Sequence, residues 1–240
     1  MKEYRGVGIL YEDNHLLVCL KPCNMPSQAD SSGDVDIQSL MKEYIAQAYG
    51  KQGNVYLGLV HRLDRPVAGL MVFARTSKAA ARLSAQVREQ SLKREYLAVV
   101  RGEMAQEGRM VDWLLKDEGT NRVRVCPKDT PLSREARLNY RCLGRQNGLT
   151  LVQVRLETGR SHQIRVQFAH SGHPLWGDAR YGNGAPGEQI ALFGAGLTLV
   201  HPVKKESMFF RAFPKNVEPW RSFQEEIRMA ADEKTENPWG

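Results

Sequence analysis

The chain has 240 residues, of which 42% are hydrophobic and 25% charged, and its formal net charge is +7. This composition is typical of a globular protein and excludes a chain that is mainly disordered. The longest apolar stretch, residues 190–200, falls short of the ~20 residues that span a bilayer, and no secretory signal follows Met1. The sequence therefore predicts a cytoplasmic protein that does not enter a membrane.

The spacing of the cysteines and histidines does not match a typical metal site. No C-x-x-C pair occurs, and the apolar surroundings predict reduced, buried side chains for all four cysteines, Cys19, Cys23, Cys126 and Cys142. His170 and His173 have a spacing that zinc sites use, but Pro174 follows directly and neither a cysteine nor a cluster of carboxylates joins them. No metal and no other cofactor is expected.

Charge is distributed unevenly along the chain. Residues 222–240 carry five acidic and two basic side chains, a net charge of −3, so the preceding part of the chain carries +10. Residues 58–101 alone carry +6. The positive charge of residues 1–221 favours a polyanionic partner. RNA or DNA is favoured over anionic lipid because no amphipathic helix has a large aromatic face. A basic surface without such a partner explains the charge equally well.

Hydrophobic patterning in the first part of the chain predicts strands and two helices around a polar segment. In chain order these are a hairpin over residues 7–22, a loop over 23–36, a helix over 37–49, strands over 57–60 and 70–74, and a helix over 77–92 that Ser77 caps. The polar segment His61–Pro66 lies between the two strands, which is where a site would be built.

The second part of the chain is predicted to consist mainly of strands. They cover residues 96–100, 109–115, 121–126, 134–143, 149–157, 197–201 and 207–213, with a helix over 161–171, a loop over 175–187 and a short buried helix over 190–197. The pattern indicates an α+β fold, a mostly antiparallel mixed sheet flanked by helices and loops. Because no linker divides the chain, we expect one domain over residues 1–221, followed by a C-terminal segment, 222–240, with a helix and an acidic disordered tail.

The first polar group of interest places Asp64 between Arg62 and Arg65, three residues after His61. Nearby cations favour the ionised carboxylate, which can act as a nucleophile or a base, and the same arginines attract phosphate. The alternative is an ordinary surface Asp–Arg pair beside a turn.

Tyr96 begins a predicted strand after three charged residues. A tyrosine there can stack on an exposed base or exchange a proton, although core packing explains it as well.

A third polar group joins the end of a predicted strand, at Thr158 and Gly159, to a helix whose first amides could bind an anion. Arg165 lies about one turn after Ser161 and can point back toward the same place. The alternative is a capped helix with solvated arginines.

Four motifs in fixed order resemble those of the RluA-type pseudouridine synthases. They are His61-Arg62-Leu63-Asp64, then Tyr96-Leu97-Ala98, then Leu156-Glu157-Thr158-Gly159-Arg160-Ser161-His162-Gln163-Ile164-Arg165, then Gly172-His173-Pro174 with Gly177-Asp178 and Tyr181. The resemblance extends from Tyr11 and Lys21-Pro22 to Arg211–Pro214, which is about five-sixths of the chain.

The resemblance implies a single catalytic domain with the pseudouridine synthase fold that isomerises uridines in structured RNA. Such an enzyme breaks the N1–C1′ bond, turns the uracil and rejoins it through C5, without a cofactor or metal. By this resemblance Asp64 is the nucleophile, Tyr96 lies beside the target base, and Arg165 pairs with Asp64. A monomer is expected, and ribosomal RNA and tRNA are both open as substrates.

A uridine in a stem must be flipped out to reach a carboxylate. We expect Arg62 to enter the vacated position or to bind the adjoining phosphate, with His61, Arg65, Arg160 and His162 as further RNA contacts. Because the motifs begin by residue 7, no N-terminal S4-type module is expected, and the helix over 77–92 would help to hold the RNA.

Two departures from the family pattern bear on substrate choice more than on activity. Relatives usually have Asp-Thr-Ser where this chain has Pro66-Val67-Ala68. They usually have Leu-His-Ala near the end, where this chain has Leu192-Phe193-Gly194-Ala195. A non-catalytic RNA-binding protein with this fold is the alternative function. A glycosidic hydrolase fits less well, because no second acid accompanies Asp64 in any of the motifs.

Overall fold

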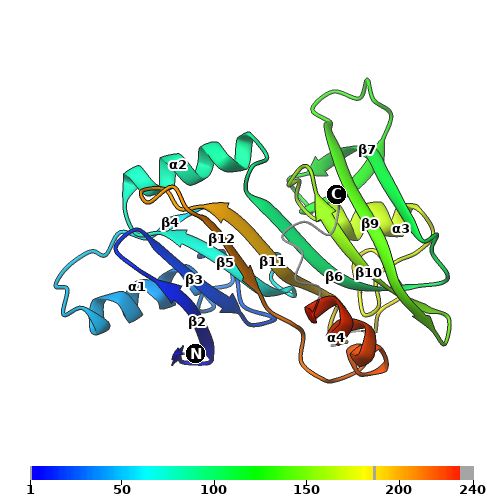
Figure 1. Cartoon of the computed structure of the whole chain (residues 1–240). Helices are drawn as coiled ribbons and strands as arrows, with labels where there is room; N and C mark the ends of the chain where they lie inside the picture. Colours follow the sequence, from blue (N-terminus) through cyan, green and yellow to red (C-terminus); the bar gives the residue numbers. More distant parts are fainter. Residues whose placement is uncertain (1, 186–187, 233–240) are drawn as a thin grey trace. The chain divides into compact units, whose positions relative to one another are not determined.

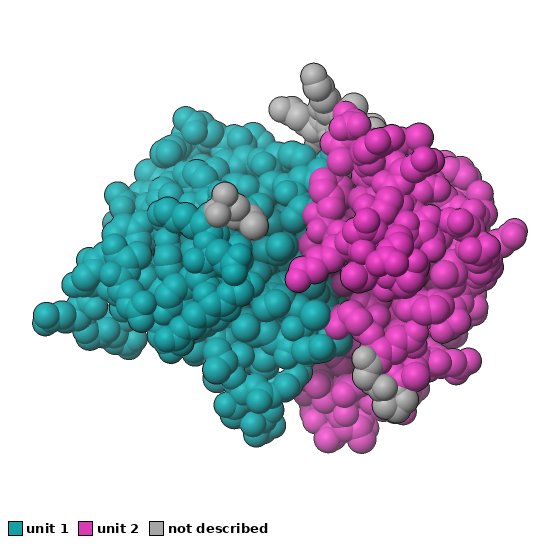
Figure 2. Space-filling view, turned by 90° about the horizontal axis from the view of Figure 1, so that it is seen from below, with its two compact units in different colours: residues 1–94, 194–212 teal, residues 95–193, 213–240 magenta. Residues whose placement is uncertain are grey.

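The computed structural model describes residues 2–185 and 188–232. The described chain forms two compact units, which Figure 2 shows in different colours. Unit 1 contains residues up to Arg94 and Gly194–Ala212, and unit 2 contains Glu95–Phe193 and the described residues from Phe213 onward. Both units are built on antiparallel strands with helices beside them, so the predicted α+β class is confirmed (Figure 1). The predicted boundary after residue 221 stays a prediction.

Unit 1 is a sheet with the strand order β1-β2-β3-β5-β11, to which β12 adds at β11 and β4 at β5. Its elements are β1 (Lys2–Tyr4), β2 (Val7–Glu12), β3 (Leu16–Lys21), β4 (Gly58–Leu59), β5 (Ala68–Ala74), β11 (Leu192–Val200), β12 (Ser207–Arg211), α1 (Ile37–Ala48) and α2 (Ser77–Arg88). The predicted hairpin forms between β2 and β3, which pair antiparallel.

Side chains next to each helix determine where α1 and α2 begin. The Asp36 carboxylate accepts a hydrogen bond from the backbone N–H of Ser39 at 2.9 Å, which satisfies one of the free amides in the first turn of α1. In α2 the cap is Thr76, whose hydroxyl accepts from the Ala79 N–H at 3.1 Å. The prediction that Ser77 caps α2 was therefore wrong by one residue, because Thr76 already has the extended backbone that a cap requires.

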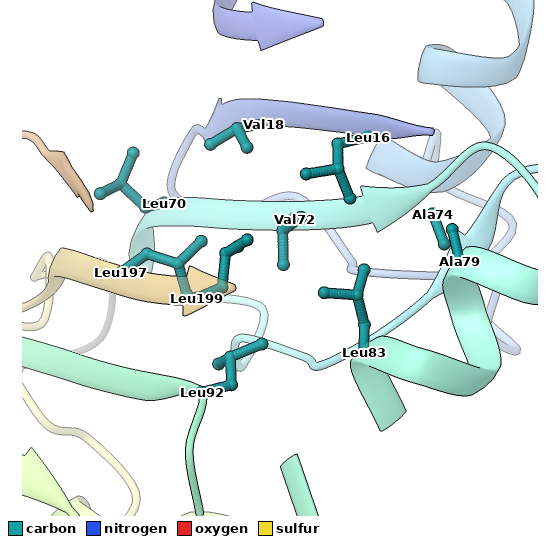
Figure 3. Packing of buried hydrophobic residues seen from close by; sticks show 10 residues of the cluster. All are labelled: Leu16, Val18, Leu70, Val72, Ala74, Ala79, Leu83, Leu92, Leu197 and Leu199. Carbon is teal, nitrogen blue, oxygen red and sulfur yellow. The ribbon is translucent and has the colours of Figure 1, made fainter. Parts of the chain in front are cut away.

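One hydrophobic cluster of the core of unit 1 lies between α2 and the sheet (Figure 3). Strands β3, β5 and β11 alternate aliphatic side chains toward this layer, and α2 contributes the residues of its apolar face. The ten buried members are Leu16, Val18, Leu70, Val72, Ala74, Ala79, Leu83, Leu92, Leu197 and Leu199. This layer holds β5 in place, and β5 follows directly on the loop that carries Asp64.

Residues 190–197 are not a helix, contrary to the prediction, because Leu192–Val200 forms the strand β11. An apolar run that is buried on both faces has no two-residue alternation, so its pattern does not distinguish a strand from a buried helix. The close contact between the backbones of β5 and β11 is consistent with a strand at this position. A Cβ on Gly69 of β5 would lie 2.3 Å from the Gly194 backbone nitrogen of β11, and Gly69 has φ +142°. Only glycine permits this approach.

A half-buried aspartate, Asp13, and a buried histidine, His201, join the turn after β2 to the turn after β11. The Asp13 carboxylate accepts from the backbone N–H of His15 and Leu16, each at 2.8 Å, and lies 2.8 Å from Nε2 of His201. Burial alone raises the pKa of Asp13, but the His15 and Leu16 amides together with His201 and Tyr11 bring the pKa down to about 2.

We predict that this carboxylate contributes to acid resistance. Because the folded-state pKa of Asp13 is depressed, its stabilising effect is complete above the unfolded value near 4 and is lost as the pH falls through about 2. Asp13→Asn should lower the free energy of unfolding by about 1–2 kcal/mol at pH 7 and by much less near pH 2. Urea unfolding at both pH values measures the difference, and an equal loss at both would contradict the prediction.

Unit 2 is a sheet with the strand order β6-β10-β9-β7-β8. Its elements are β6 (Lys93–Arg101), β7 (Glu107–Asp117), β8 (Arg122–Cys126), β9 (Arg134–Gln146), β10 (Leu149–Leu156), α3 (Gln163–His170), the 3-10 turn η1 (Trp220–Phe223) and α4 (Gln224–Asp232). The predicted hairpin of β9 and β10 forms with antiparallel pairing, and α3 contacts β7 and β8 (Figure 1). The helix predicted over 161–171 begins two residues later, at Gln163.

Three smaller predictions have different outcomes. Cys19, Cys126 and Cys142 are buried free thiols as expected, but Cys23 is exposed because it follows Pro22 in the turn after β3 rather than lying inside a strand. The acidic tail was predicted to be disordered over residues 230–240. Residues 230–232 instead belong to α4, and 233–240 lie outside the described residues. Among the described residues no helix is long and apolar enough to span a membrane.

Candidate active site

Asp64 lies in the loop between β4 and β5, half-buried, at the point where the sequence predicted a site. Its backbone oxygen accepts from the Val67 N–H at 3.0 Å, which closes a turn immediately after the carboxylate. The neighbouring residues on both sides are tied to the segment that follows β3. The loop that carries Asp64 is therefore anchored at two points.

The first anchor is Ser27, whose side chain is buried. Its hydroxyl donates to the Leu63 backbone oxygen at 2.7 Å and accepts from the Leu63 N–H at 3.1 Å. One side chain thus satisfies both backbone groups of the residue directly before Asp64, which fixes the peptide plane that leads into the nucleophile position.

The second anchor is Lys21, which is fully buried at the end of β3. Its ammonium donates to three backbone oxygens, those of Pro22 at 3.0 Å, Met25 at 2.7 Å and Arg65 at 3.1 Å. Burial lowers the pKa of Lys21 to about 8, although Cys23 and Asp64 act in the opposite direction. Lys21 therefore holds the residue after Asp64 and places a positive charge near its carboxylate.

We predict that Ser27→Ala slows the chemical step more than it weakens RNA binding. The substitution leaves two buried backbone groups of Leu63 unpaired, which costs about 1–3 kcal/mol, and it frees the loop before Asp64. A misplaced reacting group can cost about 100-fold in rate. The single-turnover rate and the RNA affinity should be measured beside Ser91→Ala, which removes an exposed hydroxyl from the same unit. Equal rates in the two folded variants would contradict the role of Ser27.

His61 is buried in unit 1, with 7% of its surface exposed. Its Nε2 accepts from the Val72 backbone N–H of β5 at 3.2 Å, and burial together with nearby Arg94 lowers the pKa of His61 to about 3. The ring is therefore neutral at pH 7 and attached to the strand. This position favours support of the Asp64 loop, and the RNA contact stays a prediction.

The two arginines beside Asp64 differ in their surroundings. Arg62 is exposed and has no hydrogen-bond or ion-pair partner among the described residues. Arg65 donates to the Ser32 hydroxyl at 3.1 Å and pairs with the Asp34 carboxylate. Arg62 is thus free to meet RNA, whereas Arg65 would have to exchange Asp34 for a phosphate.

Tyr96 lies on β6 in unit 2 and is buried, with 6% of its surface exposed. It is paired across the sheet with Val154 of β10, and Val154 is paired with Tyr140 of β9. Directly paired residues of neighbouring strands share one face of a sheet. The same face carries Ala136, whose backbone oxygen accepts from Gln167 of α3 at 3.3 Å. Tyr96 is therefore on the face that α3 covers.

Arg165 is buried in α3 and is held by Asp178. Its Nε donates to one carboxylate oxygen at 2.8 Å and a terminal nitrogen donates to the other at 2.7 Å. The same carboxylate accepts from the backbone N–H of Arg180 at 3.0 Å and of Tyr181 at 3.2 Å. Burial raises the pKa of Asp178, but the Arg165 guanidinium outweighs this and the net shift is downward. The guanidinium is thus fixed in orientation by a bidentate pair.

Tyr181 and Gln163 organise the motif around Arg165. Tyr181 lies with its ring 5.1 Å from the Arg165 guanidinium carbon and its hydroxyl 2.6 Å from Nδ1 of His162. Gln163 accepts from the Thr158 hydroxyl at 2.8 Å and from the Arg160 N–H at 3.0 Å. These contacts hold the turn before α3, where His162 has a positive φ of 52°.

The predicted site residues fall in both units. His61, Arg62, Asp64 and Arg65 belong to unit 1, and Tyr96, Arg160, His162 and Arg165 belong to unit 2. Within unit 2 the structure joins Arg165 and His162 through Tyr181. Four supporting residues were given no role from the sequence: Lys21, Ser27, Asp178 and Tyr181. Three of them lie in motifs that carried the resemblance, but Ser27 lies in a loop segment without a distinguishing pattern.

Comparisons with known proteins agree with this arrangement of motifs. A model of the RNA pseudouridylate synthase family matches residues 15–170. Ribosomal large subunit pseudouridine synthase D of Pasteurella multocida is 36% identical over 225 residues, which are 86% of this chain and 67% of that protein. The RNA pseudouridine synthase YhcT of Bacillus subtilis is 34% identical over 221 residues, 90% of this chain and 71% of that protein.

The fold agrees as well. Human RNA Pseudouridylate Synthase Domain Containing 4 superposes with a TM-score of 0.73 at 20% identity over 92% of each chain. The fold is therefore that of the pseudouridine synthases, a class of intramolecular isomerases. The chain belongs to the RNA pseudouridylate synthase family. Both the predicted family and the predicted enzyme class are confirmed.

Proposed function

We propose that this enzyme converts uridine to pseudouridine in large-subunit ribosomal RNA in the cytoplasm. The RNA class is supported by the relative from Pasteurella multocida, whose name states a ribosomal large subunit function. The observation that carries the roles of individual residues is the doubly anchored loop, in which Ser27 and Lys21 hold the backbone on either side of Asp64. A carboxylate on a fixed backbone suits attack on a flipped nucleotide.

In the proposed reaction Asp64 acts as the nucleophile, and Arg165 pairs with it to hold its position. The Asp64 carboxylate bonds to C1′ as the N1–C1′ bond breaks and the uracil leaves with the electron pair. The uracil turns while it is held, and its C5 then attacks C1′, which forms the C5–C1′ bond and releases the carboxylate. The proton on C5 is then lost and N1 regains one, so the product has the same composition as the substrate. Tyr96 serves as the base for the C5 proton.

The experiment is to incubate the protein with unmodified large-subunit ribosomal RNA and, separately, with unmodified tRNA. A nucleoside of unchanged mass that reacts with carbodiimide shows isomerisation, and we expect it in the ribosomal transcript. Product only in tRNA would overturn the RNA class. Released uracil would indicate a hydrolase, and binding without either product would indicate a non-catalytic RNA-binding protein.

A further inference from the structure

The loop between β8 and β9 displays a leucine in an unusual backbone conformation. Leu132 is 90% exposed and has a φ of +65°. The Ser133 N–H donates to the Thr130 oxygen at 3.1 Å, which closes a turn with Pro131 and Leu132 at its centre. Proline fixes a negative φ, so the turn is of type II, whose third position favours glycine or asparagine.

Single exposed leucines are common and need no explanation by themselves. A leucine with positive φ is rare because its Cβ crowds the backbone. The surrounding loop is also held firmly, since Thr130 N–H donates to the Pro127 oxygen at 3.1 Å and the Ser133 hydroxyl donates to the Lys128 oxygen at 3.4 Å. The fold therefore keeps Leu132 in the solvent where a glycine would be less strained, which points to a use for the side chain.

Two arginines whose side chains have no carboxylate partner among the described residues lie next to this turn. Arg134 is exposed at the start of β9, two residues after Leu132. Arg160 is also exposed, and its Nε donates to the Glu135 backbone oxygen at 2.9 Å, which attaches it beside Arg134. Among the described residues, the Arg134 side chain has no hydrogen bond or ion pair, and the terminal nitrogens of Arg160 have none either.

The nearby carboxylates are already occupied. Glu135 pairs with Arg137, and Glu157 accepts from Arg137 at 3.0 Å and from Arg109 at 2.9 Å. Burial and the charges of Arg134 and Arg137 lower the pKa of Arg160, and Glu135 opposes this only in part. Within the loop, Lys128 and Asp129 cancel in charge. A net positive charge therefore remains at Arg134 and Arg160. A bound anion would reduce the repulsion between the two guanidinium groups.

We propose that Leu132, Arg134 and Arg160 form an RNA-binding surface, in which Leu132 packs against an unstacked base and the two arginines bind the adjoining phosphates. Apolar side chains inserted at base steps and arginines on phosphates are a recurrent combination in nucleic-acid recognition. Arg160 was expected to contact RNA from the sequence, whereas Leu132 and Arg134 carried no such signal. This proposal rests on the proposed function, in which RNA is the substrate. It adds a protein contact that selects RNA with an unstacked base near the modified uridine.

The first test uses Leu132→Gly and Leu132→Asn. Both residues tolerate positive φ, so the melting temperature should stay equal or rise. RNA affinity should nevertheless fall by roughly 5-fold or more, because the apolar contact between the leucine side chain and the base is lost. A variant that is at least as stable but binds RNA more weakly shows that the strained leucine serves binding. Unchanged affinity in both variants would overturn the role of Leu132.

The second test uses Arg134→Gln with Arg124→Gln as the matched control. Arg124 is exposed on β8 and pairs with Leu115, whereas Arg134 pairs with the adjacent Leu114, so the two arginines lie on opposite faces of the sheet. Arg134→Gln should reduce the slope of log affinity against log salt by about 0.7–0.9, which corresponds to one lost phosphate contact. An equal change in the control would show a general charge effect and overturn the site.

The RNA for both tests is whichever unmodified transcript, large-subunit ribosomal RNA or tRNA, the unsubstituted protein binds more tightly. Affinity does not depend on product formation, so the tests give a result even if the ribosomal assignment fails. Failure of that assignment would appear in the pseudouridine assay alone, and failure of the binding surface would appear in the affinities alone.

Discussion

Asp64→Asn should abolish pseudouridine formation while the protein still folds and binds RNA. The amide is close in size to the carboxylate, so the turn to the Val67 N–H and the anchors at Leu63 and Arg65 are kept, because all three use backbone atoms of the loop. The substitution removes the negative charge and the nucleophilic oxygen that the proposed reaction needs. We expect the single-turnover rate to fall by at least about 10⁴-fold, as for the loss of an essential nucleophile in other enzymes.

The matched control is Asp34→Asn. It removes the same charge from a carboxylate in the same unit that pairs with Arg65, yet it lies outside the loop between β4 and β5. We expect it to retain activity and to bind RNA as well as the unsubstituted protein or better, since it frees Arg65. Measurable product from Asp64→Asn, or an equal loss of activity in the control, would refute the assignment of Asp64 as nucleophile.

The second large effect is expected for Asp178→Ala, in both stability and activity. The substitution leaves the buried Arg165 guanidinium without the carboxylate that accepts two of its hydrogen bonds and exposes two backbone amides, at Arg180 and Tyr181, without their acceptor. Breaking a buried ion pair from one side costs about 3–5 kcal/mol. For a chain of this size that corresponds to a melting temperature lower by roughly 6–20 °C.

Activity should fall further than the loss of folded protein explains, because Arg165 loses its fixed orientation. Asp178→Asn separates the two effects, since its side-chain oxygen can still accept from the Arg180 and Tyr181 amides while the charge is gone. Thermal unfolding and single-turnover rates should be compared with those of Asp129→Ala, an exposed aspartate of the same unit. A stable and fully active Asp178→Ala variant would contradict the role given to this pair.

Arg165 illustrates how far the sequence predicted the site. Its place on a helix after the turn at Thr158–Arg160 followed from the pattern, and α3 does carry it. The bidentate partner did not follow from the pattern, because Asp178 lies 13 residues later in a glycine-rich loop and meets Arg165 only when that loop folds back on α3. The motif containing Asp178 contributed to the resemblance without indicating which side chain it would contact.

The surroundings of His61 and Ser27 did not follow from the sequence. His61 directly precedes Arg62, and an RNA contact was predicted for it. Successive residues of an extended loop point in different directions, so its ring faces the core, and the RNA contact stays a prediction. Ser27 was assigned to a loop without any function, since one serine among several polar residues has no pattern. Its role depends on a contact with a residue 36 positions away.

Local pattern alone determined much of this protein. Alternation of apolar residues predicted the hairpins β2–β3 and β9–β10, helical spacing predicted α1 and α2, and the order of the motifs identified the family. The hairpins and helices depend on residues a few positions apart, so propensity and periodicity are sufficient to predict them. The family followed instead from the resemblance of the motifs to those of known enzymes. The position of Asp64 between the half-buried strand β4 and the buried strand β5 belongs to the same group.

Three features could be seen only in the tertiary structure. They are the strand conformation of β11, the anchors of the Asp64 loop and the strained turn at Leu132. The apolar run of β11 suits a buried helix equally well, and the close approach of Gly69 and Gly194 makes it a strand. Lys21 and Ser27 become parts of the site because hydrogen bonds join them to residues 44 and 36 positions away. Such contacts depend on the packing of distant segments, and a one-dimensional pattern does not contain that information.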